Sequence, residues 1–234
     1  MKKIIIAEKP SVAQEYAKVL GVSGKSGQGY IENESWIVTW TVGHLVTLAY
    51  PEKYGDNLKE WKLETLPFIP EKYKYEIIAE TRKQFEIVKK LYNRSDVTAI
   101  YYAGDSGREG LYIQMLVRML AGHNPQAQEK VVWINSQTED EILNGIAEAK
   151  SLSEYKNMSD AGYMRGIADY LVGINFSRVL SILYAPMLNT GSGQKHKVPI
   201  SVGRVMTCVL GMIVRREREI VNFKVQNFYR IKGT

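Results

Sequence analysis

The stretch Thr98–Leu120, TAIYYAGDSGREGLYIQMLVRML, decides the fold. It begins with an apolar run typical of a buried strand, continues with a short polar loop, and ends in an apolar stretch with helical spacing. Asp105, Arg108 and Glu109 belong to the polar part. The stretch therefore predicts a strand, a turn that carries charged side chains, and a helix.

A second stretch near the start of the chain has the same arrangement. Residues 2–21, KKIIIAEKPSVAQEYAKVLG, begin with β-branched residues and turn at Glu8 and Lys9. Apolar residues at helical spacing then lead to Gly21, with Ser11 as a candidate N-cap. Two strand–turn–helix units with an acidic residue at the turn are thus expected in one chain.

The alternation of strands and helices continues along the first 150 residues. Further strands are expected at residues 36–40 and 130–134, and helices at residues 80–92 and 138–149, the last with a capping box. This order predicts an α/β fold, a mostly parallel sheet with helices on both faces. Ligands of such a sheet gather at the carboxyl ends of its strands.

The pattern becomes helical after about residue 150. Two long helices are expected, over residues 160–188 and 202–221, joined by a loop rich in Gly, Ser and Lys. The tail from residue 223 has the pattern of a strand. We expect an α/β domain over 1–152, part of a helical domain over 153–222, and the start of a further domain over 223–234.

The positive charge is concentrated in the helical part. The chain has a formal net charge of +6, and residues 160–234 carry 11 Lys and Arg against 4 Asp and Glu. A near-neutral body with a basic end suits a polyanionic partner, although solubility alone would also account for it.

Composition also bears on location. Cys208 is the one cysteine, which excludes an internal disulfide framework and a cysteine-rich zinc site. The first residues contain too short an apolar run for a signal-peptide core, and no uninterrupted apolar run approaches the length of a membrane span. We therefore expect a cytoplasmic, nucleoid-associated protein with no membrane contact.

The two acidic turns suggest a metal site. A parallel sheet would place Glu8 and Asp105 on one rim, where one or two carboxylates suffice for Mg²⁺ when water and phosphate complete its coordination. Lys9 and Arg108 would then face phosphate oxygens. The alternative is structural: Asp105 would cap the following helix, and Arg108 with Glu109 would form a solvated ion pair.

Taken together, these blocks resemble the type IA DNA topoisomerases, particularly the topoisomerase III branch. The resemblance runs over essentially the whole chain, through residues 4–13, 41–48, 61–70, 103–110, 164–178 and 201–210. The first and fourth blocks resemble the acidic motifs of the family's Toprim domain. The last two resemble helices that help to hold single-stranded DNA.

The resemblance assigns roles to individual residues. It implies metal ligands at Glu8, Asp105 and Glu109, and catalytic roles for Glu8, Lys9, Arg108 and Glu109. It implies contacts with DNA from a set spread over both parts of the chain: Lys9, His44, Arg165, Asp169, Arg178, Ser201 and Arg204. The basic loop around Lys195 and Lys197 is expected to contribute to the same single-strand site.

The sequence departs from the family pattern at several positions. Gly107 and Leu111 replace two acidic residues of the second motif, which leaves metal binding without DNA an open question. Met206 and Cys208 replace the usual Gln and Pro. None of the 15 tyrosines stands in the Tyr-Pro-Arg-like motif of the family's nucleophile, which we expect outside these residues.

The leading hypothesis is the Toprim-containing part of a type IA topoisomerase, which cleaves and rejoins single-stranded DNA through a 5′-phosphotyrosine link with Mg²⁺. The alternatives are another Toprim enzyme, primase-like or nuclease-like, and a non-catalytic module that binds single-stranded DNA. We expect a monomer with single-stranded DNA as its partner. A helicase partner and the preference between DNA and RNA stay open.

Overall fold

The structure is a computed structural model of the chain, and it describes residues 1–24, 29–122, 124–189 and 198–233. The chain divides into two compact units, each built from two segments. Unit 1 contains residues 1–54 and 70–167, and unit 2 contains residues 55–69 and 168–234.

Unit 1 is built on a six-stranded sheet with the order β2-β3-β1-β6-β7-β8. Its strands are β1 (Lys2–Ala7), β2 (Tyr30–Glu32), β3 (Trp36–Trp40), β6 (Val97–Ala103), β7 (Gln128–Val131) and β8 (Lys150–Ser151). The four central strands are parallel, and the short edge strands β2 and β8 are antiparallel to their neighbours. A separate antiparallel pair consists of β4 (Val46–Leu48) and β5 (Tyr75–Ile77).

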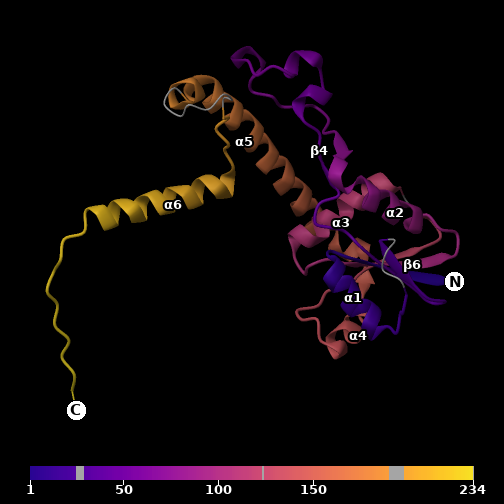
Figure 1. The fold of residues 1–234 in the computed structure, drawn as a ribbon. Coiled ribbons are helices and arrows are strands. Elements are labelled where there is room, and N and C mark those ends of the chain that lie inside the picture. Colours follow the sequence, from indigo (N-terminus) through magenta and orange to yellow (C-terminus); the bar gives the residue numbers. More distant parts are fainter. Residues whose placement is uncertain (25–28, 123, 190–197, 234) are drawn as a thin grey trace. The chain divides into compact units, whose positions relative to one another are not determined.

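Helices cover both faces of this sheet (Figure 1). They are α1 (Pro10–Val19), α2 (Arg82–Tyr92), α3 (Arg108–Ala121) and α4 (Glu139–Ala147). Ile4 and Ile6 of β1 pack toward α2 and α3, whereas Ile5 and Ala7 pack toward α1 and α4. Because β1 is buried on both faces, its apolar run is continuous, as expected of a central parallel strand.

The predicted fold class is confirmed, but the cap predicted at Ser11 is wrong, and the capping box predicted at Thr138 and Glu141 does not form. Helix α1 begins at Pro10, so Lys9 occupies the N-cap position that we assigned to Ser11. Thr138 is the N-cap of α4, but its side chain makes no capping hydrogen bond. Glu141 instead accepts a hydrogen bond from the backbone N–H of Asn135, at 3.3 Å.

Short 3₁₀ turns join the regular elements. They are η2 (Pro51–Lys53), η3 (Asp56–Leu58), η4 (Leu63–Thr65), η5 (Ala79–Thr81) and η6 (Leu152–Tyr155). Of these, η3 and η4 belong to unit 2, where they pack with the second half of α5 (Lys156–Asn189).

Side-chain amides and hydroxyls of α5 hold the rest of unit 2 against this helix. The Asn175 carboxamide accepts from the Phe68 N–H at 2.6 Å and donates to the Phe68 carbonyl at 3.0 Å. Two residues later, Ser177 Oγ accepts from the Val202 N–H at 2.8 Å, and about one turn beyond it Ser181 Oγ accepts from the Ile200 N–H at 2.8 Å. These pairs position the segment that leads into α6 (Arg204–Val221).

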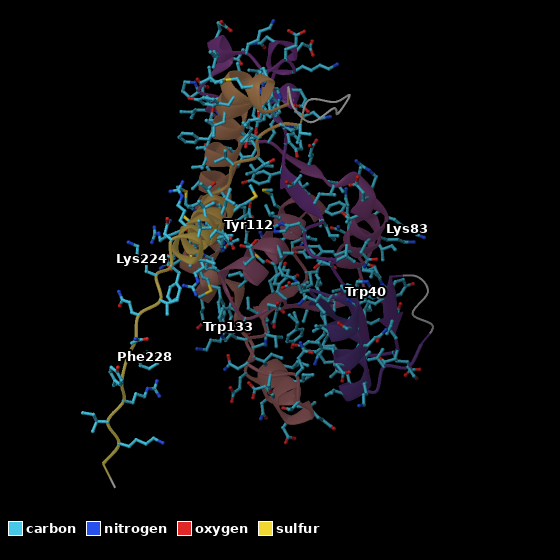
Figure 2. The ribbon with its side chains drawn as sticks, turned by 60° about the vertical axis from the view of Figure 1, so that its left-hand side comes forward. Trp40, Lys83, Tyr112, Trp133, Lys224 and Phe228 are labelled. Atoms are coloured by element: carbon cyan, nitrogen blue, oxygen red, sulfur yellow. The ribbon has the colours of Figure 1, made fainter. Side chains whose placement is uncertain are left out.

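The end of unit 2 differs from the expectation. Residues 223–233 form no strand, because no neighbouring strand pairs with them among the residues that the structure describes. Lys224 and Phe228 project from this tail (Figure 2). Helix α6 is exposed along its whole length, including Leu210, Met212 and Ile213.

Helix α5 contributes to both units, with residues 156–167 in unit 1 and 168–189 in unit 2. The two units therefore meet inside a continuous helix, between residues 167 and 168, whereas we expected a domain boundary at residue 152.

Within the described residues, the helical span Leu152–Leu188 is long and apolar enough to cross a membrane by length and composition alone. Our search for uninterrupted apolar runs missed it, because Asn175 and Arg178 interrupt the pattern. Both side chains bind backbone groups of residues 55–69.

Candidate active site and nucleic-acid interface

The two acidic turns meet at the carboxyl edge of the sheet. Strands β1 and β6 are parallel neighbours with Ala7 opposite Ala103, so the residues that follow them lie side by side. The Asp105 backbone N–H donates to Glu8 Oε2 at 2.9 Å. Lys9 Nζ lies 3.5 Å from Asp105 Oδ2, and both of these side chains are more than half exposed.

A second charged group forms around Glu109, in the first turn of α3. Glu109 Oε1 lies 3.1 Å from His44 Nε2, and Glu109 Oε2 accepts from Arg165 Nη1 at 3.1 Å. In the sequence, His44 lies 65 positions and Arg165 lies 56 positions from Glu109. The fold thus engages both oxygens of this carboxylate.

Gly110 allows α3 to begin directly against the Asp105 loop. A Cβ at position 110 would lie 2.2 Å from the Asp105 carbonyl oxygen and 2.8 Å from the Asp105 nitrogen. These are backbone atoms, so a larger residue would have to displace the loop. The absence of a side chain at Gly110 therefore maintains the bond between Asp105 and Glu8.

The first half of α5 packs equally closely on Tyr112 of α3. A Cβ at Gly162 would lie 2.9 Å from the Tyr112 Cβ, and one at Gly166 would lie 2.4 Å from the Tyr112 hydroxyl. The Tyr112 ring also contacts the rings of His44 and Tyr163, with centroids 5.9 and 5.3 Å away. This contact places Arg165 within reach of Glu109.

The arrangement fits a hard cation at Glu8 and Asp105 better than at the predicted set of three. Within the part of the chain that the structure describes, no three His, Cys, Asp or Glu side chains are close enough to bind one metal ion. Glu8 and Asp105 offer carboxylate oxygens at one rim, as Mg²⁺ requires when phosphate and water complete its shell. Glu109 is held by His44 and Arg165 instead.

The predicted DNA-binding residues of unit 2 form another ion pair. Arg204, at the start of α6, donates to both Asp169 oxygens, at 2.7 and 3.3 Å. This hydrogen bond, together with the negative charge of Asp169, raises the pKa of Arg204 above its usual value. Ser201 is exposed in the segment before α6.

Arg178 differs from the other predicted DNA contacts, because its side chain is buried. It donates to the Leu58 carbonyl at 3.0 Å, and its guanidinium lies 5.4 Å from the centre of the Trp61 ring. These contacts within unit 2 indicate a structural role. The side chain of Arg108 is exposed and has no ion pair among the described residues, whereas Lys195 and Lys197 lie outside them.

Sequence reasoning missed several residues that build these sites. Gly110 and Tyr112 shape the rim in unit 1, and Asn175, Ser177 and Ser181 organise unit 2. The glycine was visible in the acidic motif, but only the close approach of two backbones shows why it is needed. The two serines are spaced i to i+4, and this spacing puts them on one helical face.

The chain matches two protein families in succession. Residues 3–136 match the Toprim domain, and residues 153–234 match the DNA topoisomerase family. The first match covers the acidic rim of unit 1 and the sheet up to β7, without the edge strand β8. The second begins just before α5, close to the domain boundary expected from the sequence.

Curated relatives agree with these matches. The chain is 41% identical over 233 residues to DNA topoisomerase 3 of Bacillus thuringiensis strain Al Hakam, and 40% identical over 232 residues to that of Staphylococcus saprophyticus. It is 38% identical over 231 residues to DNA topoisomerase 3 of Staphylococcus haemolyticus. Each alignment covers 99% of this chain and 30% of the relative, so the chain spans about a third of its relatives' length. The chain belongs to the type IA DNA topoisomerase family, in its topoisomerase III branch, and it carries that family's Toprim domain.

Proposed function

We propose that this chain supplies the Toprim domain and adjoining helices of an enzyme that cleaves and rejoins single-stranded DNA through a 5′-phosphotyrosine link with Mg²⁺. The observation that carries the proposal is the meeting of Glu8 and Asp105, joined at 2.9 Å, with Lys9 beside them. Two carboxylates and a cation at one sheet edge suit a phosphate that reacts beside a metal ion.

Within this proposal, Glu8 and Asp105 would hold Mg²⁺, whose chemistry is to offset the charge that develops on the scissile phosphate. Lys9 and Arg108 would bind the non-bridging phosphate oxygens. Lys9 is already held near the rim by Asp105, and Arg108 begins α3 with an exposed side chain. Binding by these cations would orient the phosphate toward the attacking group.

We assign Glu109 to proton transfer instead of metal binding. Its two oxygens interact with His44 and Arg165, which hold the carboxylate in one orientation. A positioned carboxylate can take or supply a proton only when the reacting oxygen comes within hydrogen-bond distance. His44 and Arg165 would therefore act as positioning residues, and they would lie beside the bound DNA.

The nucleophilic tyrosine would come from outside these 234 residues. The tyrosines beside the rim are poorly suited to attack a phosphate, because burial raises the pKa of Tyr112, and burial raises that of Tyr163 to about 12. Tyr50 precedes a proline but is followed by Pro51-Glu52, which departs from the family motif. The chain alone is expected to form no covalent adduct with DNA, and an adduct mapped to one of its tyrosines would overturn this assignment.

Unit 2 would hold the single strand through phosphate contacts. Arg204 and Asp169 form a half-exposed pair, and Ser201 is exposed three residues before the start of α6 at Arg204. An arginine in such a pair keeps exposed N–H groups that can reach a phosphate. We propose this surface as part of the strand-binding site of a cytoplasmic, monomeric enzyme.

The metal site can be tested by titrating the chain with Mn²⁺, a spectroscopic substitute for Mg²⁺, in Asp105→Asn and in the matched control Asp140→Asn. Asp140 is an exposed residue of α4. We expect Asp105→Asn to weaken binding about tenfold or more, and Asp140→Asn to leave it unchanged. Equal binding in the two variants would rule out a metal at the rim.

A non-catalytic DNA-binding module is the alternative that the geometry favours most, because the described residues hold no three-ligand metal group. The match of residues 153–234 to the topoisomerase family argues against a primase-like or nuclease-like enzyme. A full-length protein that binds single-stranded DNA without cleaving it, with or without Mg²⁺, would favour the module.

A further inference from the structure

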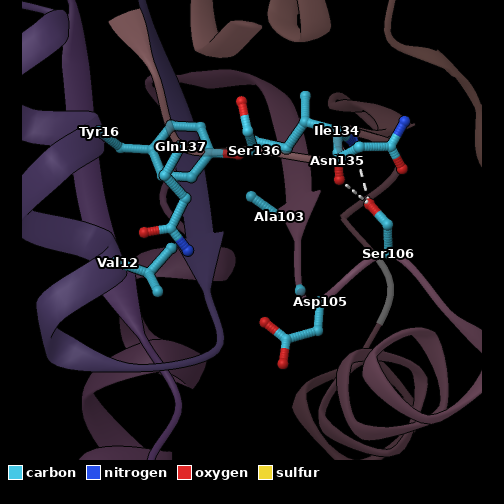
Figure 3. Close-up of a pocket in the computed structure, with 10 residues that line it drawn as sticks. Val12, Tyr16, Ala103, Asp105, Ser106, Ile134, Asn135, Ser136 and Gln137 are labelled. Atoms are coloured by element: carbon cyan, nitrogen blue, oxygen red, sulfur yellow. Dashed lines mark hydrogen bonds between the residues drawn. The ribbon is translucent and has the colours of Figure 1, made fainter. Parts of the chain in front are cut away.

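A pocket of about 480 Å³ opens behind the acidic rim of unit 1 (Figure 3). Val12 and Tyr16 of α1 line one side, and the segment from Ile134 to Gln137 lines another. Asp105 stands at its edge, between this pocket and Lys9. The proposed reaction uses Asp105 but assigns nothing to the residues from 134 to 137.

Two hydrogen bonds hold the wall of the pocket in place. Ser106 Oγ donates to the Ile134 carbonyl at 2.6 Å and accepts from the Ile134 N–H at 2.9 Å. The next residue, Asn135, is tied by its backbone N–H to Glu141 of α4. The pocket is therefore shaped before any ligand arrives, which lowers the entropic cost of binding.

The lining has the chemistry of a site for a flat, uncharged heteroaromatic group. Val12, Tyr16 and Ala103 supply apolar surface, while Gln137 supplies a carboxamide that can both donate and accept hydrogen bonds. Such carboxamides pair with the edges of nucleobases. Asp105 is the one charged residue of the lining, and its negative charge disfavours a phosphate inside.

We propose that this pocket binds a nucleobase of the DNA strand, next to the phosphate held at Lys9 and Asp105; the inference rests on the proposed function. A base lies one sugar away from its phosphate, so a phosphate at the rim brings a neighbouring base to the pocket mouth. Gln137 would bind the edge of that base. The site would thus add a preference for certain bases to a reaction that otherwise recognises the backbone.

The direct test is nuclear magnetic resonance of the ¹⁵N-labelled chain with 2′-deoxyadenosine and 2′-deoxycytidine, and with deoxyribose 5-phosphate as the control. At least one nucleoside is expected to shift the amide resonances of Ser106 and Gln137, and the sugar phosphate is not. Gln137→Ala should weaken nucleoside binding about fivefold, the effect of one lost hydrogen bond. Gln126→Ala, an exposed glutamine outside the pocket, should leave it unchanged.

The pocket assignment fails if neither nucleoside shifts these resonances, or if Gln137→Ala binds as tightly as the unaltered chain. Fluorescence anisotropy with a labelled single strand separates this failure from failure of the proposed function. A strand that binds through Arg204 while nucleosides do not bind would remove the pocket and keep the DNA site. Nucleosides that bind while the strand does not would keep the pocket and remove the DNA site.

Discussion

Gly110→Ala should damage the acidic rim through a single methyl group. The new Cβ would lie 2.2 Å from the Asp105 carbonyl oxygen and 3.0 Å from the Asp105 carbonyl carbon, and neither can rotate away as a side chain would. The Asp105 loop would have to move, and the 2.9 Å bond from its N–H to Glu8 would break. Stability and metal binding should fall together.

The expected loss of folding stability combines two destabilising contributions and one stabilising contribution. Overpacking costs about 1 to 3 kcal/mol, and losing a hydrogen bond to a carboxylate costs about 1.5 to 3 kcal/mol. Alanine regains about 1 kcal/mol of helix propensity over glycine. The net loss of about 1.5 to 5 kcal/mol corresponds to a fall in melting temperature of roughly 3 to 20 °C for a chain of this size.

Gly107→Ala is the matched control, three residues earlier, at the N-cap of α3. A Cβ at Gly107 meets nothing within 4 Å, and its backbone is extended, with φ 176°. Losing the preferred N-cap residue should cost no more than about 1 kcal/mol. Calorimetric melting and Mn²⁺ titration of both variants decide the matter. If Gly110→Ala has the same melting temperature and the same Mn²⁺ affinity as Gly107→Ala, the close approach of the two backbones is unimportant.

Four further predictions concern the rest of the chain. Arg204→Ala should lower the slope of log affinity against log salt for single-stranded DNA by about one, which binding isotherms at several salt concentrations measure. Arg178→Ala should instead lower the melting temperature of the chain, which calorimetry measures. Burial raises the pKa of Glu129, but hydrogen bonds, chiefly from Arg118, outweigh it and lower that pKa below its ordinary value. This stabilisation is present above the ordinary pKa and is lost as pH falls through the folded value, so Glu129→Gln should flatten the acid side of the stability curve in calorimetric melts. Asn175→Ala removes both hydrogen bonds to the Phe68 backbone and should speed hydrogen exchange at that amide, by a change of about 1 to 3 kcal/mol in opening free energy.

Local pattern was enough to predict the central architecture. The continuous apolar run of β1 and the helical spacing after Arg108 reflect burial within single elements, which neighbouring residues determine. The proximity of Glu8 and Asp105 also follows from the sequence, because both residues succeed parallel strands and such strands end at the same edge.

The partners of individual side chains could not be predicted in this way. The contacts of Glu109 with His44 and Arg165 span 65 and 56 residues, and no local period encodes such pairs. Arg178 was expected to contact DNA, yet its side chain is buried and donates to the Leu58 carbonyl. The predicted strand after residue 223 failed for a related reason, since a strand depends on a partner elsewhere in the chain.

The antiparallel edge strands of the large sheet have a consequence for solubility. An open strand edge offers unpaired N–H and C=O groups to other molecules and can begin aggregation. Here β2 has three residues and β8 has two, so each edge presents a very short template for a foreign strand. The parallel strands β3, β1, β6 and β7 lie between these two edge strands. The sheet of unit 1 therefore offers little open strand edge for pairing with another chain.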